Sequence, residues 1–264
     1  MSSIPYQEVP VQVEGARCWL VGASSGLGAA LARALDEAGA EVVVSARREE
    51  RLRELSDGTG MRPVVVDVTD PASVRTAYER VLAELGGLDL VVYCAGTWQV
   101  SDVGDWDQES FEQHVRTNLL GLGQCLDVTL PTLRAQGSGT VVGIASVAAY
   151  RGVPGADYYG PTKAAAVNLL EALRASLRPD GVRVMSVLPG FVRSEMTDSA
   201  DFPQPFKITA EDAAARILDG LARDRSVLVF PRRMRALMTG ARLVPAGLWP
   251  HLTPVLRQPW VRRL

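Results

Sequence analysis

Residues 17–28 read RCWLVGASSGLG, an apolar run that ends in three glycines, and this stretch decides the fold class. The run predicts a buried strand, and the periodic pattern at 27–38 predicts a helix. Gly22, Gly26 and Gly28 allow a tight turn and let backbone N–H groups approach a pyrophosphate. The partial positive charge of a helix N-terminus favours the same anion. The glycines in this place indicate a dinucleotide site, and the alternative is a turn without a ligand.

Short apolar runs alternate with helical patterns along the rest of the chain. Strands are expected at 17–21, 41–45, 63–66, 88–93, 140–145, 182–188 and 227–230. Helices are expected at 27–38, 48–55, 71–85, 111–133, 158–177 and 210–222. The strands are continuously apolar, as strands buried on both faces of a parallel sheet are. We therefore expect an α/β fold, a doubly wound, Rossmann-like sheet of seven parallel strands in a single domain, with ligands at the carboxyl ends of the strands.

Bulk composition excludes several classes of protein. The chain has 264 residues and a net charge of −2, which gives no sign of nucleic-acid binding. Three cysteines without regular spacing and two histidines argue against a disulfide framework or a metal site. The first residues lack the basic start and apolar run of a signal peptide, and no stretch approaches the ~18 apolar residues of a membrane span. A cytoplasmic protein without a metal is expected.

A set of residues suited to acid–base chemistry follows the fifth strand. Ser146 comes directly after that strand, and Tyr159 and Lys163 lie four residues apart on a predicted helix, so that both point to one face. A free tyrosine has a pKa of about 10, and a neighbouring ammonium group lowers that pKa toward the range that a general acid or base needs. Tyr158 is a rival, but it lies five residues from Lys163, and its expected role is packing.

Further motifs follow the strands in order. They are Asp67-Val68 after the third strand, Cys94-Ala95-Gly96 after the fourth, Asn118 in the long helix, and Pro189-Gly190-Phe191-Val192 with Ser194 after the sixth. With the glycine loop and the Tyr-x-x-x-Lys pair, they resemble the short-chain dehydrogenase/reductase family over roughly residues 15–230. The departures are small. Cys94 stands where the family has Asn, and Ser194 replaces Thr and keeps the hydroxyl.

The resemblance implies an oxidoreductase that moves a hydride between a nicotinamide and a carbonyl or secondary alcohol. It implies that Tyr159 transfers the proton, that Ser146 polarises the substrate oxygen, and that Lys163 binds the nicotinamide ribose. Asn118 would hold a water that links Lys163 to solvent. The cofactor-binding residues that it implies are Gly22, Ser24, Ser25, Gly26, Leu27, Gly28, Arg47, Asp67, Val68, Cys94, Ala95, Gly96, Tyr159, Lys163, Pro189, Gly190, Val192 and Ser194.

The end of the second strand bears on which nicotinamide is bound. NAD enzymes usually place a carboxylate there to bind the ribose 2′-hydroxyl, but Ala46 occupies that position. Arg47 follows and would pair with a 2′-phosphate through charge-assisted hydrogen bonds, to which Ser24 or Ser25 would add a hydroxyl donor. We therefore predict NADP(H). The alternative is that Arg47 and Arg48 are a solvated helix start with loose cofactor selectivity.

The last part of the chain is basic and amphipathic. Residues 225–264 carry eight arginines and no acid, and residues 232–244 place Met234, Leu237, Met238 and Ala241 on one helical stripe. We divide the chain into a catalytic domain at 1–230 and an extension at 231–264. Three alternatives remain for the extension: a helix and arm packed on the body or on a second subunit, a lid over an apolar substrate pocket, or a membrane-surface segment. The polar segment at 198–205 is expected to be a loop or a lid.

The extension also bears on the substrate and on the oligomeric state. The apolar extension suggests a hydrophobic ketone such as a lipid, a steroid or an aromatic ketone. The long extension replaces the Gly-Gly turn with which many tetrameric relatives end, so a homodimer is favoured over a tetramer. Alternatives to an enzyme are a non-catalytic NADPH-binding sensor or scaffold and an interaction module. The intact Tyr159 and Lys163 argue against both.

Overall fold

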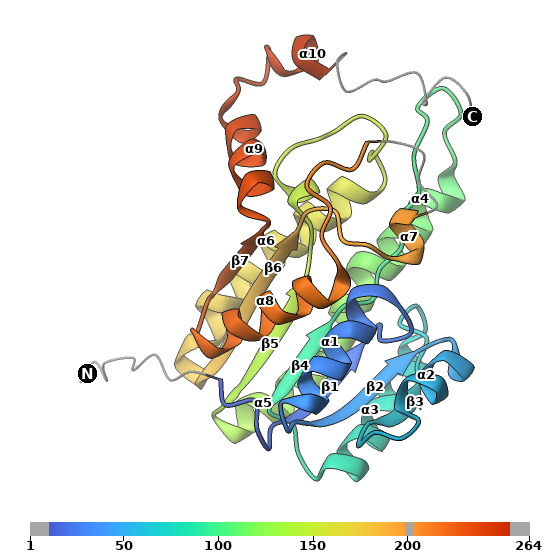
Figure 1. Cartoon of the computed structure of the whole chain (residues 1–264), viewed down its shortest axis with the longest axis vertical. Helices are drawn as coiled ribbons and strands as arrows, with labels where there is room; N and C mark the ends of the chain where they lie inside the picture. The colour runs from blue at the N-terminus through green and yellow to red at the C-terminus, as the bar shows by residue number, and fades with distance from the viewer. Residues whose placement is uncertain (1–10, 199–202, 254–264) are drawn as a thin grey trace, which may run out of the picture.

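The computed structural model describes residues 11–198 and 203–253. Its centre is one sheet of seven parallel strands in the order β3-β2-β1-β4-β5-β6-β7 (Figure 1). The strands are β1 Arg17–Val21, β2 Glu41–Ala46, β3 Arg62–Val65, β4 Leu90–Tyr93, β5 Gly139–Ile144, β6 Val182–Pro189 and β7 Val227–Phe230. The winding reverses at β1, which lies between β2 and β4, so the doubly wound fold predicted from the sequence is confirmed.

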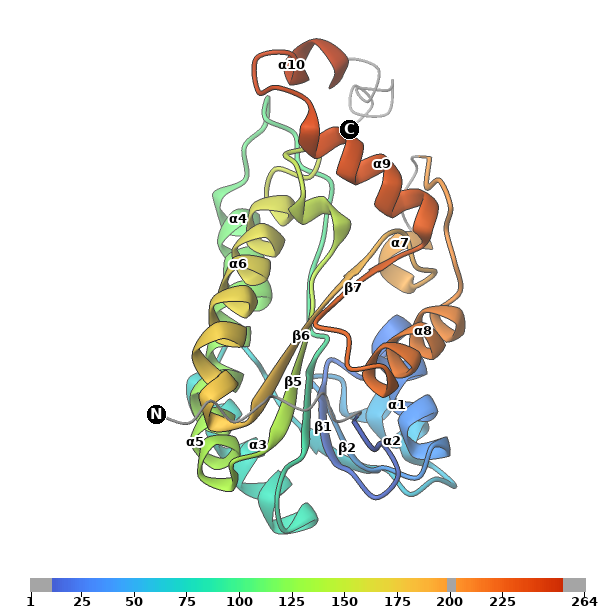
Figure 2. The same ribbon diagram turned by 90° about the vertical axis from the view of Figure 1, so that its left-hand side faces the viewer.

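Helices cover both faces of the sheet (Figure 2). One face carries α1 (Gly26–Glu37), α2 (Glu49–Ser56) and α8 (Ala210–Ala222). The other carries α3 (Pro71–Leu85), α5 (Gly121–Gln136) and α6 (Tyr159–Leu177). The remaining α-helices are α4 (Gln108–Val115), α7 (Glu195–Asp198), α9 (Arg232–Leu243) and α10 (Trp249–Leu252). In both views α9 and α10 lie beyond the carboxyl ends of the strands.

Strand β1 shows why the strands are apolar without interruption. Its successive side chains point to opposite faces, so that Leu20 joins the core on the α1 side and Trp19 joins the core on the α3 side. Both are fully buried. The Trp19 ring packs 5.6 Å from that of Tyr78, and its indole N–H donates to Ser45 Oγ at 3.0 Å. Burying each such side chain contributes roughly 1.5–3 kcal/mol, which secures the strands that carry the site.

The long helix predicted at 111–133 is interrupted. The structure divides it into α4 and α5, joined by a π-helical turn at Arg116–Leu120. Asn118 lies in this turn and is 1% exposed. Its side chain is bonded to Thr97 and Thr162, which lie outside the helix. π-Turns of this kind occur mostly as local insertions in α-helices at functional sites, and a periodic sequence pattern does not reveal them.

The described part of the extension packs on the body of the molecule. Met234 of α9 is 2% exposed and belongs to a small core with Val147 and Leu188. The indole N–H of Trp249 in α10 donates to the Gly152 carbonyl at 2.8 Å. These contacts place α9 and α10 against the body, and the role of the extension stays a prediction. Val255, Leu256 and Trp260, which the sequence also placed in the extension, lie outside the described residues.

Candidate active site

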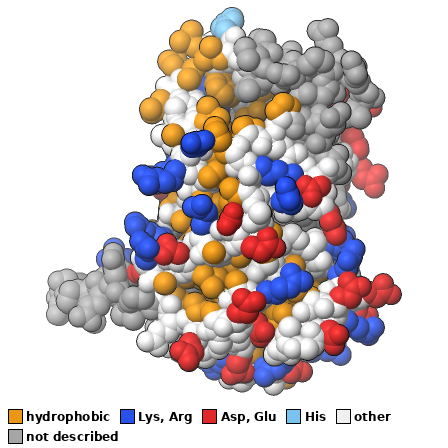
Figure 3. All heavy atoms as spheres, in the orientation of Figure 1, with side chains coloured by type: hydrophobic (Ala, Val, Ile, Leu, Met, Phe, Trp, Pro, Cys, Tyr) orange, Lys and Arg blue, Asp and Glu red, His pale blue; other side chains and the backbone are white. Residues whose placement is uncertain are grey.

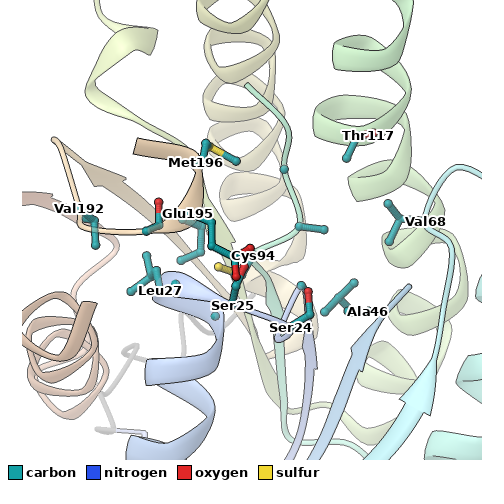
Figure 4. Close-up of a pocket in the computed structure, with 18 of the residues that line it drawn as sticks. Ser24, Ser25, Leu27, Ala46, Val68, Cys94, Thr117, Val192, Glu195 and Met196 are labelled. Carbon is teal, nitrogen blue, oxygen red and sulfur yellow. The ribbon is translucent and has the colours of Figure 1, made fainter. Parts of the chain in front are cut away.

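A cleft of about 480 Å³ opens at the carboxyl ends of the strands. All the cofactor-binding residues expected from the sequence line it, and so do Ser146, Tyr159 and Lys163. Figure 4 shows Ser24 and Ser25 beside the start of α1, with Ala46 and Val68 to one side and Val192 to the other. Glu195 and Met196 of α7, which the sequence assigned to no site, form part of the same wall. The expected residues thus come together in one place, apart from Asn118.

Two glycines of the first loop allow the floor of the cleft to form. Gly22 has φ +97°, and a Cβ there would collide with the backbone of Ala95. A Cβ on Gly28 would collide with the Gly22 carbonyl oxygen, because the loop folds directly back on the first turn of α1. No side chain fits at either point. The start of α1 therefore faces the cleft with its backbone N–H groups, the arrangement that binds phosphate groups.

Ser146, Tyr159 and Lys163 meet at the inner end of the cleft. Ser146 caps the short 3-10 turn Val147–Ala149 after β5, and its hydroxyl lies close enough to Tyr159 to lower the pKa of the phenol. Tyr159 opens α6 and Lys163 follows one turn later, with its ammonium nitrogen 5.6 Å from the centre of the Tyr159 ring. Lys163 Nζ also donates to the Ile144 carbonyl at 2.9 Å. The end of β5 thus orients both partners of the pair.

Comparison with known proteins identifies this arrangement. The family model "short chain dehydrogenase" matches residues 18–204. The chain belongs to the short-chain dehydrogenase/reductase family. An uncharacterized oxidoreductase of Myxococcus xanthus is 34% identical over 243 residues, which cover 90% of this chain and 96% of that protein.

Solved structures agree with this assignment. A short chain dehydrogenase from Burkholderia cenocepacia, solved in complex with NADP, superimposes with a TM-score of 0.81 at 28% identity, and the match covers 92% of this chain and 99% of that one. A short chain dehydrogenase/reductase from Burkholderia phymatum, solved in complex with NAD, has a TM-score of 0.80 at 22% identity and covers 86% and 93%. The second likeness shows the fold alone.

The arginines after β2 in this short-chain dehydrogenase differ in their surroundings. Arg48 donates to Ser24 Oγ at 3.0 Å and Ser25 Oγ at 2.8 Å, and its other amino group forms an ion pair with Glu195 at 2.8 Å. Arg47 lies in the cleft wall on the side of Asp67. The sequence assigns Arg48 to no site, and only the alternative of a solvated helix start mentions it. No local signal reveals its role, because Glu195 is 147 residues away in the chain.

Neighbouring groups keep the Asp67 carboxyl in the cleft ionised. Burial by itself raises the pKa of its carboxyl, but hydrogen bonds from the backbone and hydroxyl of Thr69, at 2.9 and 2.8 Å, lower it. The nearby Arg47 charge lowers it further, and the net pKa lies below the ordinary value. Asp67 is therefore ionised at neutral pH and available as a hydrogen-bond acceptor.

Burial dominates the titration of the Tyr159–Lys163 pair. It raises the pKa of Tyr159 to about 12, against a smaller lowering by the hydrogen bond with Ser146. It lowers the pKa of Lys163 to about 8, against a smaller raising by Cys94. The expectation that the ammonium lowers the tyrosine pKa is therefore not met in this structure. The physical reason is that loss of water penalises the charged form of both groups.

Asn118 lies behind the cleft wall rather than in it. Its Oδ1 accepts from the Thr97 backbone N–H at 2.8 Å, and its Nδ2 donates to the Thr97 carbonyl and to Thr162 Oγ1, both at 3.0 Å. Both amide hydrogens are thus used. The side chain ties the segment after β4 to α6, next to Lys163. Thr97 and Thr162, which sequence reasoning missed, complete this connection.

Tyr158 has the packing role expected of it. It is 1% exposed, and its ring meets Trp106 edge to face with the ring centres 4.8 Å apart. Its hydroxyl accepts from the Asp107 backbone N–H at 2.8 Å. The Tyr158 hydroxyl is thus held at the start of α4, and Tyr159 alone of the two tyrosines lines the cleft.

Proposed function

We propose that this chain is an NADP(H)-dependent oxidoreductase that transfers a hydride between the nicotinamide and a carbonyl or secondary alcohol. The observation that carries the cofactor choice is the end of β2. Ala46 leaves that position without a carboxylate, and Arg47 and Arg48 both line the cleft beside it. Two guanidinium groups fit a 2′-phosphate, which NADP carries and NAD lacks. The likeness to a relative solved with NADP supports this choice.

The residues of the cleft fit a dinucleotide along its whole length. The start of α1 offers backbone N–H groups for the pyrophosphate, and Asp67 and Val68 flank the end of β3, where the adenine would lie. Pro189, Gly190, Val192 and Ser194 would hold the carboxamide end. When bound, the nicotinamide supplies or accepts the hydride.

The protein's own part in the reaction is proton transfer and polarisation. Tyr159 donates the proton from its hydroxyl to the substrate oxygen in reduction and takes it back in oxidation. Ser146 hydrogen-bonds the same oxygen and the tyrosine hydroxyl. Lys163 binds the hydroxyls of the nicotinamide ribose and lies one turn of α6 from Tyr159. Asn118 positions Thr97 and Thr162 around Lys163. It would also hold a water that links Lys163 to solvent.

The substrate that we propose is a hydrophobic ketone or alcohol. Val147 and Met234 line an apolar cluster directly behind Ser146, with Phe191 packed against it. Met196 and Phe206 are exposed large apolar side chains at 37% and 41%, and Met196 lines the cleft itself. An exposed methionine in the cleft wall and an apolar cluster next to Ser146 favour an uncharged substrate.

The experiment that tests the function is a steady-state comparison of the two cofactors with a panel of aliphatic, steroid and aromatic ketones. We expect oxidation of NADPH with at least one hydrophobic ketone and a clear preference for NADPH over NADH in kcat/KM. Cofactor binding without turnover on any ketone or alcohol would favour the non-catalytic sensor. A preference for NADH would overturn the cofactor assignment.

The expected homodimer is also a proposal, as is the cytoplasmic location. Sedimentation equilibrium of the full chain tests the first, with a dimer as the expected mass. A tetramer would contradict it.

A further inference from the structure

The extension carries four large apolar side chains that are more than half exposed. They are Leu237 and Leu243 of α9, Leu248 before α10, and Leu252 of α10, with exposures of 54%, 78%, 57% and 53%. We call these four leucines the tail face. Figure 3 shows hydrophobic side chains gathered at this end of the molecule, with basic side chains beside them.

Other side chains of the extension supply the packing that holds these helices on the body. Met234 is buried against the core near Leu188, and Trp249 is fixed by its hydrogen bond to Gly152. The Arg242 guanidinium lies 5.8 Å from the centre of the Tyr150 ring, and the Arg151 guanidinium lies 5.2 Å from that of Trp249. The tail face is therefore presented outward by an anchored element, and core packing does not account for its leucines.

The charges within the extension itself have one sign. Arg232, Arg233, Arg235 and Arg242 lie on α9, and the sequence has no acid from 225 to the end. Because the chain as a whole has a net charge of −2, residues 1–224 carry −10. An anionic surface would attract the extension and repel the body, and would thereby orient the molecule.

We infer that the tail face docks on an anionic lipid bilayer, with the leucines in the headgroup region and the arginines beside lipid phosphates. Basic residues interleaved with leucine and tryptophan are the composition of helices that lie in a membrane interface. Among the described residues, no helix is long and apolar enough to cross a membrane, so the segment would lie on the surface. The loop before α4 reaches the same end of the molecule (Figure 1) and carries Asp102 and Asp105. Because an anionic bilayer would repel these carboxylates, the docking surface is limited to α9 and α10.

Docking in this orientation has a consequence for the substrate. The extension lies at the same end of the sheet as the cleft, and Met234 packs directly on Gly190 of the cleft wall. A hydrophobic ketone dissolved in the bilayer would reach the cleft from the lipid side. This route rests on the proposed function, whereas docking itself does not.

The test is co-sedimentation of the full chain with vesicles of phosphatidylcholine alone and of equal parts phosphatidylcholine and phosphatidylglycerol. We expect binding to the anionic vesicles that weakens with added salt, and weak binding to the neutral ones. Arg232→Glu with Arg235→Glu should lower the partition coefficient about tenfold or more. Arg75→Glu with Arg80→Glu, on exposed positions of α3, makes the same change in net charge and should leave sedimentation near the wild-type level.

A second pair of variants tests the leucines without changing the charge. Leu243→Ser with Leu248→Ser should reduce vesicle binding several-fold, whereas Leu120→Ser, at a position 51% exposed in the π-helical turn, should not. Equal loss with the α3 control, or no binding to either vesicle, would overturn the inference. So would a dimer in sedimentation equilibrium that the leucine pair dissociates, because the tail face would then be covered by a second copy. None of these readouts uses activity, so failure of docking and failure of the proposed reaction are distinguishable.

Discussion

Arg48 connects two walls of the cofactor cleft. Its guanidinium donates hydrogen bonds to Ser24 and Ser25 on the glycine loop and forms an ion pair with Glu195 on α7 at 2.8 Å. A second arginine, Arg51, lies 3.7 Å from the other oxygen of Glu195. The Glu195 carboxylate is therefore paired with the same Arg48 guanidinium that would bind a 2′-phosphate under the proposed function. The Glu195 carboxylate and the 2′-phosphate would compete for Arg48.

The first prediction concerns this competition. Glu195→Gln should lower the Kd for NADPH by about two- to fivefold, because it removes a rival anion, and an exposed ion pair of this kind is weak. The Kd for NADH should change little. Fluorescence titration of both cofactors measures the effect, and Glu50→Gln, which removes an exposed carboxylate from α2, serves as the control. An equal gain for NADH and NADPH would show that Glu195 does not act through the 2′-phosphate site.

Cofactor choice itself is tested at the end of β2. Ala46→Asp places a carboxylate where a 2′-phosphate would lie, and like charges repel strongly in a partly closed cleft. We expect kcat/KM for NADPH to fall by about tenfold or more, which corresponds to about 1.4 kcal/mol, while the value for NADH is kept or rises. Initial-rate kinetics with one ketone measures both. Unchanged NADPH kinetics would remove the end of β2 from the cofactor site.

The two adjacent tyrosines make a matched pair of variants. Tyr159→Phe should lower kcat by about 10²- to 10⁴-fold, the usual contribution of a general acid, and leave NADPH binding intact. Tyr158→Phe should keep turnover and reduce the free energy of unfolding by about 0.5–1.5 kcal/mol, because the Asp107 N–H loses its acceptor. Turnover and urea denaturation of both variants check this. Substantial activity in Tyr159→Phe would remove that residue from the catalytic role.

The lowered pKa of Lys163 predicts a pH dependence of stability. Its pKa is about 8 in the folded chain and near 10.5 when unfolded, so the unfolded chain binds more protons between these values. Lys163 should therefore make the free energy of unfolding rise as pH increases from about 8 toward 10.5. Tyr159, with its folded pKa raised from 10 to about 12, should act in the opposite sense only above pH 10.

The measurement is the melting temperature of the wild type and of Lys163→Met between pH 7 and pH 10, where the tyrosine contributes little. The buried Cys18, Cys94 and Cys125 thiols, whose pKa values burial raises, lower the stability of both proteins as pH rises. The difference between the two proteins isolates the lysine. The melting temperature of the wild type should rise relative to that of Lys163→Met as pH increases. A difference that does not change with pH would contradict the buried position of Lys163.

The connection through Asn118 gives the last prediction. Asn118→Ala leaves the backbone N–H and carbonyl of Thr97 without their partners, which should cost about 1–3 kcal/mol in the free energy of unfolding. Asn118→Asp, as a neutral acid, keeps an acceptor for the Thr97 N–H and one of the two donors, so its loss of stability should be intermediate. Urea denaturation orders the three proteins. Equal stability of wild type and Asn118→Ala would show that the segment after β4 is held by other contacts.

The parallel sheet was predictable because each strand is recognised locally. VVV at 42–44 and LVVY at 90–93 are apolar at every position, which only a strand covered on both faces requires. The glycine loop, the serine after β5 and the Tyr-x-x-x-Lys spacing are also short-range patterns. Each of these motifs stands at the end of a strand, so the fold brings them into one cleft.

What the sequence by itself determined is the set of elements, their parallel arrangement and the groups that gather at the strand ends, since all of these depend on residues close together in the chain. Tertiary structure alone decided that Arg48 meets Glu195, that Asn118 interrupts a helix to bond Thr97 and Thr162, and that the tail face points outward. It also decided the pKa values of Tyr159 and Lys163, because the loss of water around a group depends on every element packed over it, and neighbours in the sequence do not report it.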